Sequence, residues 1–181
     1  FIGELDGTMV AVTSTGIGGP SAAIAVEELH QCGADTMMRV GTCASVSPKV
    51  SLGDVVIPNG AVKMEGVSQH YLPVEFPSVP DFQMLKCIEQ AAINLDYPYN
   101  VGVTITKASF YTQTEPETKP VGPELQYKWS AYEKGGATST SMECAPLFAV
   151  GASLGIRTAC VMASATNCRN YSDNGRKSEI D

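Results

Sequence analysis

Hydrophobic and polar residues follow two patterns along the chain. Short apolar runs predict strands, and longer segments in which apolar residues recur every three or four positions predict helices. We expect strands at residues 8–14, 36–43, 53–64, 100–111 and 157–167, and helices at 20–33, 82–94, 125–134 and in the second half of 137–155. Most strands are nearly continuous apolar runs that alternate with helices. This pattern predicts an α/β fold with a mixed, largely parallel central sheet flanked by helices.

Glycine and proline mark the turns between these elements. The first twelve residues predict a hairpin around Asp6-Gly7, and the helix at 20–33 is expected to have Ser21 as its N-cap and to end at Gly33. The proline-containing stretches 70–82 and 112–124 predict loops. With no linker or repeat, residues 1–181 are expected to form a single domain. The unpartnered hairpin and the polar end "DNGRKSEID" indicate that N-terminal and C-terminal pieces of this domain are lacking.

Composition and charge exclude several classes of function. The 181 residues carry a net charge of −7, whereas nucleic acid and anionic membranes call for a basic surface, so neither is expected as a partner. No apolar run approaches the roughly 20 residues of a membrane-spanning helix. The six cysteines form no CxxC pair, and His30 and His70 have no ligand-spaced partner. We therefore expect reduced, mostly buried thiols in a cytoplasmic protein, and no metal site.

The segment "STGIGGPS" at residues 14–21 joins a predicted strand to a predicted helix, where glycine-rich turns often bind phosphate. The spacing of Gly16, Gly18 and Gly19 does not fit the dinucleotide fingerprint, and the turn lacks the Gly-Lys-Ser/Thr ending of a P-loop. By itself the segment is a weak phosphate signal, and the alternative is a tight turn that needs small residues.

Arg39 is the first residue whose chemistry stands out, because it lies inside an apolar strand. A charge in that position is costly unless it is paired or faces a ligand, and a guanidinium fork matches phosphate oxygens. Gly41 and Thr42 follow at the end of the strand and offer backbone N–H groups and a hydroxyl. The sequence predicts a phosphate site here, with a structural salt bridge as the alternative.

Two further residues are candidates for ligand contacts. Glu143 in "SMEC" lies between a polar strand edge and an apolar helix, where a carboxylate could hydrogen-bond hydroxyl groups near a developing positive charge. The alternative is an ordinary glutamate favoured by the helix macrodipole. Phe110 ends a strand just before the 112–124 loop, where it could stack on a ligand or belong to the core.

Five segments in this order resemble the nucleoside phosphorylase family, in particular its uridine phosphorylase branch. They are "STGIGGPSAAIAVEEL", "MRVGTCASV", "GDVVIPNGAVKMEGVSQHYLPVEFP", "GVTITKASFY" and "SMECAPLFA". The resemblance implies a three-layer sandwich in which inorganic phosphate is the co-substrate, no metal or organic cofactor takes part, and the protein is at least a dimer. It also implies three groups of contacts: Arg39, Gly41 and Thr42 on phosphate, Thr42, Met142, Glu143 and Ile17 on ribose, and Phe110 on the base.

The chain departs from this family at several positions. Ala44 stands where glycine is common, and Ser141 and Cys144 flank Met142-Glu143 in place of glutamate and serine. The Gly-Gln-x-Arg pattern that reads uracil is also missing after Phe110. Gln113 could replace the glutamine, and Arg169 or Lys119 could replace the arginine.

Three functions are compatible with the sequence. The first is phosphorolysis of a nucleoside, most simply uridine, to free base and ribose 1-phosphate, with Arg39 and Glu143 as the catalytic residues. The second is a nucleosidase of the same fold, which would lack a phosphate arginine and use an aspartate where Asn167 stands. The third is a nucleoside-binding protein without turnover.

Overall fold

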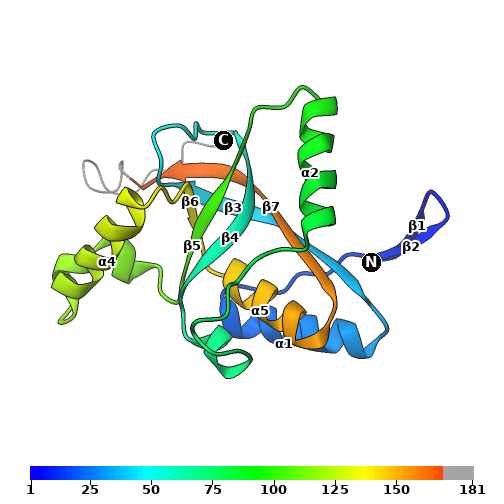
Figure 1. The fold of residues 1–181 in the computed structure, drawn as a ribbon, viewed down its shortest axis with the longest axis horizontal. Coiled ribbons are helices and arrows are strands. Elements are labelled where there is room, and N and C mark those ends of the chain that lie inside the picture. Colours follow the sequence, from blue (N-terminus) through cyan, green and yellow to red (C-terminus); the bar gives the residue numbers. More distant parts are fainter. Residues whose placement is uncertain (169–181) are drawn as a thin grey trace.

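The structure is a computed structural model that describes residues 1–168 (Figure 1). Its strands are β1 (Ile2–Leu5), β2 (Thr8–Ala11), β3 (Thr36–Ser45), β4 (Val55–Met64), β5 (Tyr99–Lys107), β6 (Ser139–Ser141) and β7 (Arg157–Asn167). Its α-helices are α1 (Gly19–Gln31), α2 (Phe82–Asn94), α3 (Tyr111–Thr114), α4 (Gly122–Lys134) and α5 (Cys144–Leu154). Two short 3-10 helices, η1 (Val67–His70) and η2 (Pro116–Thr118), lie in the connections.

Five strands form one mixed sheet, which closes on itself in the order β3-β6-β5-β4-β7. β3 runs parallel to β7 along its whole length, and β4 with β5 and β5 with β6 are also parallel. The contacts of β3 with β6 and of β4 with β7 are short and antiparallel. α1 and α5 lie side by side below the sheet in Figure 1, and α2 packs against β4 and β7. The predicted mixed α/β fold with flanking helices is confirmed, and the closure of the sheet is a feature that the apolar runs did not indicate.

Helix α5 contributes the centre of the hydrophobic core. Its Phe148 is 1% exposed and belongs to a cluster with Val26 of α1, Val56 of β4 and Met162 of β7. Residues 144–151 of α5 are buried on every side. A helix that is apolar all round needs such burial, which explains why this part of the sequence shows no polar face.

The N-terminal hairpin is confirmed, whereas the predicted cap of α1 is wrong. β1 and β2 pair antiparallel with Leu5 opposite Thr8, and Asp6 and Gly7 between them both have a positive φ. The N-cap of α1 is Gly18, at φ 91°, a conformation that favours glycine. Ser21 lies inside the helix, where its hydroxyl donates to the carbonyl oxygen of Ile17. Backbone conformation at Gly18, and not a capping side chain, decides where α1 begins.

Two other segments differ from the predictions, since the apolar run at 36–43 predicts a buried strand and the stretch 112–124 predicts a loop. β3 is not a fully buried strand, because Met38 and Val40 are 50% and 72% exposed while Met37 and Cys43 face the core. The strand therefore alternates, although both of its faces carry apolar residues. The predicted loop at 112–124 is partly helical and contains η2. None of the helices in the described range is long and apolar enough to cross a membrane.

Candidate active site

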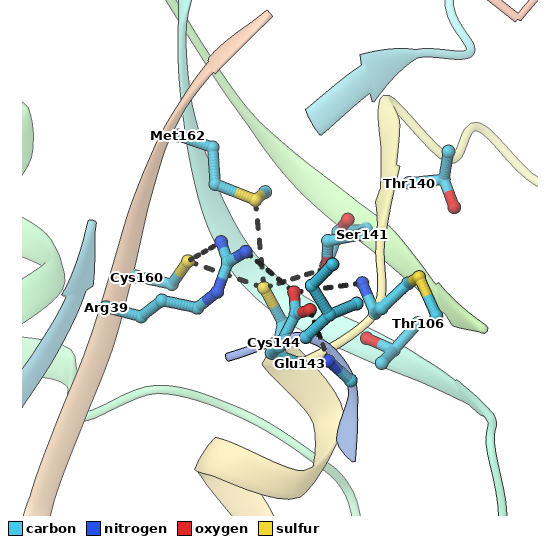
Figure 2. A network of polar contacts seen from close by, with 12 residues as sticks. Arg39, Thr106, Thr140, Ser141, Glu143, Cys144, Cys160 and Met162 are labelled. Carbon is cyan, nitrogen blue, oxygen red and sulfur yellow. Dashed lines mark hydrogen bonds and ion pairs between the residues drawn. The ribbon is translucent and has the colours of Figure 1, made fainter. Parts of the chain in front are cut away.

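Glu143 is the centre of a buried polar network (Figure 2). Its side chain is 7% exposed, and its Oε1 accepts a hydrogen bond from the backbone N–H of Gly18 at 2.8 Å. Its Oε2 accepts from Nη2 of Arg39 at 2.6 Å and from the backbone N–H of Met142 at 3.2 Å. Glu143 occupies the N-cap position of α5 but makes no capping hydrogen bond with its side chain. The carboxylate is held by Arg39 and Gly18, which are distant in the sequence, and by the backbone of the adjacent Met142. It is therefore more than an ordinary glutamate at the start of a helix.

Arg39 brings its guanidinium to this carboxylate from the middle of β3, and its side chain remains 20% exposed. Burial would lower the pKa of Arg39, but its interactions with Cys160, Cys144 and Glu143 outweigh burial and raise it, so the group stays charged. A guanidinium carries five N–H donors, and Glu143 accepts from Nη2 at a single oxygen. Arg39 thus forms a salt bridge, which was one interpretation of the sequence. It also keeps N–H donors for an anion, which the phosphate-site interpretation required.

Gly41 lies directly beside the guanidinium. A Cβ atom at Gly41 would lie 2.7 Å from Nη1 of Arg39 and 2.8 Å from both Cζ and Nη2. Real Cβ atoms essentially never come so close to another heavy atom. The structure therefore assigns Gly41 a role that the sequence did not show: it leaves room for the Arg39 side chain to fold across the strand.

Sulfur atoms line the buried side of the ion pair (Figure 2). Cys160 Sγ lies 3.8 Å from Nη1 of Arg39 and 3.4 Å from Cys144 Sγ, which is itself 3.9 Å from Met162 Sδ. Burial raises the pKa of the Cys160 thiol well above its ordinary value. All six cysteines are free; Cys43, Cys144 and Cys160 are buried as predicted, whereas Cys32 and Cys87 are exposed.

The glycine-rich turn before α1 reaches Glu143 through the backbone of Gly18. At Gly19, a Cβ atom would lie 2.9 Å from Cγ of Pro146 and 3.2 Å from Cγ2 of Val67, so the start of α1 can approach α5 only because this residue is small. The turn is therefore a structural turn that also supplies one hydrogen bond to the site. Ile17 is 80% exposed beside it, and its contact with ribose stays a prediction.

A cavity of about 160 Å³ lies between α4 and the ends of β4 and β5. Gln113 lines it, and its Nε2 donates to Cys168 Sγ at 3.0 Å. The Oε1 of Gln113 is buried and has no hydrogen-bond partner among the residues that the structure describes. The other residues that line it are Met64, Lys107, Thr112, Pro116, Leu125, Gln126, Trp129, Ser130 and Glu133. Phe110 lies next to this region and is 44% exposed, so it is not a core residue.

Lys107 is the residue of this region that the sequence reasoning missed. It ends β5 and is only 6% exposed, and its Nζ donates to Oγ1 of Thr140 at 3.2 Å. The same Nζ lies 5.8 Å from the centroid of the Phe110 ring, within the range of a cation–π contact. Burial lowers the pKa of Lys107, although its interactions with Cys168 and Glu143 oppose this. The signal was present: like Arg39, Lys107 is a cation in an apolar strand, "TITKASF".

The structure does not bring every predicted residue into this network. Thr42 is exposed, and among the described residues no hydrogen bond joins it to Arg39 or Glu143, so its phosphate contact stays a prediction. Met142 contacts Glu143 through its backbone. Lys119 Nζ lies 3.9 Å from Oε2 of Glu115, and Lys119 is not one of the residues that line the cavity. Arg169 lies outside the described residues.

The fold and this network define an α/β protein whose site combines a cation suited to an anionic ligand with a carboxylate suited to hydroxyl groups. A family model described as the phosphorylase superfamily matches residues 1–179, and the chain belongs to this superfamily. The resemblance inferred from the sequence segments is thereby confirmed.

Several curated relatives extend this result. The chain is 44% identical over 162 residues to a uridine phosphorylase of Treponema pallidum (strain Nichols), covering 90% of this chain and 63% of the relative. It is 38% identical over 170 residues to a uridine phosphorylase of Escherichia coli (strain K12), covering 91% and 66%. A guanosine phosphorylase of Halorubrum lacusprofundi is 36% identical over 156 residues, covering 86% and 60%. The chain therefore spans less than two thirds of the length of these relatives.

Proposed function

We propose that this protein is a nucleoside phosphorylase that cleaves uridine with inorganic phosphate to give uracil and ribose 1-phosphate. The observation that carries the proposal is the contact of Arg39 with Glu143 at 2.6 Å, in which one side chain can bind an anion and the other can bind hydroxyl groups. Relatives whose names say uridine phosphorylase support uridine as the first substrate to test.

In this proposal Arg39 binds one substrate, phosphate, and Glu143 binds the other, the nucleoside. An oxygen of phosphate attacks C1′, the bond from C1′ to the base breaks, and the electron pair leaves with the base, which then takes a proton from solvent. Arg39 binds the phosphate with the N–H groups that Glu143 does not use. Glu143 accepts hydrogen bonds from ribose hydroxyls, and these strengthen as positive charge develops on the sugar ring.

The geometry around Glu143 favours such a role because the carboxylate is already oriented. The N–H of Gly18 and the guanidinium of Arg39 hold its two oxygens, so little reorganisation is needed when charge develops nearby. A carboxylate held this way stabilises the transition state more than the bound nucleoside. Its loss should therefore lower kcat more than it raises KM.

The experiment measures release of uracil from uridine with and without phosphate. Arg39→Ala should abolish the phosphate-dependent reaction, and Glu143→Gln should lower kcat strongly. Arg157→Ala is the matched control, because Arg157 forms an exposed ion pair with Asp35 at 3.9 Å, away from this network. Release of base without phosphate would instead indicate a nucleosidase, and binding of uridine without release would indicate a non-catalytic protein.

We further propose that the active form is a homo-oligomer in the cytoplasm that needs no metal or organic cofactor. The exposed apolar residues Val74, Phe76 and Val79 support an interface in the 70–82 segment, and the free cysteines support a reducing compartment. Sedimentation of the active protein tests the first statement, since a fully active monomer would contradict it. Activity that survives exhaustive chelation and dialysis is expected, and its loss would contradict the absence of a cofactor.

A further inference from the structure

Lys107 carries a buried positive charge with few partners of its own. Its ammonium group has three N–H donors, whereas the described residues provide one hydrogen bond, to the neutral hydroxyl of Thr140, and no ion pair. A buried charge is costly unless acceptors surround it. The aromatic face of Phe110, 5.8 Å from Nζ, compensates only in part. The position of Lys107 in the wall of the cavity gives an additional acceptor a place to bind.

Gln113 presents the complementary feature in the wall of the same cavity. Its Oε1 is buried and accepts no hydrogen bond from residues 1–168, and such a carbonyl oxygen is expensive to leave unsatisfied. Lys107 therefore has unused donors and Gln113 an unused acceptor. A ligand that satisfies both must present an acceptor and an N–H donor on one edge.

We propose that Lys107 is a specificity-determining and catalytic residue that donates to a carbonyl oxygen of the nucleobase while Gln113 accepts the adjacent ring N–H. The proposal rests on the phosphorolysis proposed above and supplies the cation for which the 112–119 segment offers no arginine. When the bond from C1′ to the base breaks, the electron pair delocalises onto the carbonyl oxygens of the base. The ammonium of Lys107 stabilises that negative charge without giving up its proton.

This pair of groups selects a chemical class of base. Uracil presents a carbonyl oxygen beside a ring N–H, and 6-oxopurines present the same edge. Cytosine and adenine present an exocyclic amino group beside an unprotonated ring nitrogen, so the donor of Lys107 would face a donor. A site built on polar groups discriminates strongly when the wrong ligand leaves those groups unpaired.

The test compares uridine with 5-fluorouridine in wild type, Lys107→Met and Lys107→Gln. Loss of a charge-assisted hydrogen bond should lower kcat/KM for uridine about 10- to 100-fold in Lys107→Met. The loss for 5-fluorouridine should be smaller, because fluorine stabilises the departing base and reduces the need for the cation. Lys107→Gln keeps an N–H donor without the charge, so its kcat/KM for uridine should lie between the values for Lys107→Met and wild type. Lys86→Met is the matched control, since Lys86 makes a similar contact with the Phe82 ring, at 5.6 Å, on the exposed surface.

Two measurements on the wild-type protein keep the proposal falsifiable if a variant fails to fold. Uridine and inosine should be cleaved with higher kcat/KM than cytidine and adenosine, and uracil should bind more tightly than cytosine by titration calorimetry. Equal or better use of cytidine and adenosine would overturn the proposal. So would equal losses for uridine and 5-fluorouridine in folded Lys107→Met, or no loss for either.

These results separate the two proposals from each other. Wild-type protein that shows no phosphate-dependent cleavage but binds uracil through Lys107 would disprove the phosphorylase function and leave the base contact standing. Equal rates of uridine cleavage by the wild-type protein and by folded Lys107→Met would confirm the function and disprove the contact.

Discussion

Gly41→Ala should displace the Arg39 guanidinium without altering any charge in the site. The new Cβ atom would lie 2.7 to 2.8 Å from three guanidinium atoms, whereas ordinary contacts begin at 3.4 Å. The guanidinium must therefore shift by about 0.6 to 0.7 Å to restore ordinary contact. Because a 1 Å misplacement at a reacting centre costs roughly 100-fold in rate, we expect a loss of about 10- to 100-fold. Gly41 is not among the residues with positive φ, so alanine is compatible with the backbone. The flexible end of one side chain absorbs the clash, and the fold should survive.

The assay is the initial rate of phosphate-dependent uracil release, with phosphate and uridine varied separately. We expect Gly41→Ala to lower kcat/KM for phosphate about 10- to 100-fold. The free energy of unfolding in urea should remain within about 1 kcal/mol of wild type. Gly60→Ala is the matched control, because it also adds a methyl group to a strand glycine but meets its nearest atom at an ordinary 3.8 Å. Wild-type kinetics in Gly41→Ala would contradict this prediction, because they would show that the position of the guanidinium does not affect the reaction.

Three further predictions follow from burial. Because burial lowers the pKa of Lys107 below its ordinary value of 10.5, kcat/KM for uridine should fall with rising pH earlier than an exposed lysine would allow, and Lys107→Met should lack this alkaline decline. Burial raises the pKa of the Cys43 thiol from 9.0 to about 12. The protonated thiol therefore contributes fully to the free energy of unfolding below pH 9, and this contribution is lost as pH rises towards 12. Urea unfolding of Cys43→Ala should accordingly depend less on pH over that range, and an unchanged slope would contradict this. Phe148→Ala should lower the free energy of unfolding by about 3–5 kcal/mol, whereas Phe82→Ala, at a residue 67% exposed, should change it little in the same urea titration.

Local sequence pattern determined most of the elements. α2 and β7 begin and end at the residues that the pattern predicted, and the Asp6-Gly7 turn forms the expected hairpin. These features depend on periodicity, on turn residues and on the N-cap Asp81, all of which act within a few positions. The functional importance of Arg39 could be predicted in the same way, because a charge in an apolar strand requires a partner, whichever part of the chain supplies it.

The identity of the partners required the tertiary structure. Glu143 is 104 residues from Arg39 and 125 residues from Gly18, and no local pattern states that β3, α5 and the glycine turn meet at one point. The same limit applies to Lys107, whose burial depends on Thr140 and Phe110 and on the α4 region that closes the cavity. The sequence shows which charged side chains require a partner or a ligand. The register and closure of the sheet decide which of them come together, because long-range contacts depend on strand pairing and not on the period of any one segment.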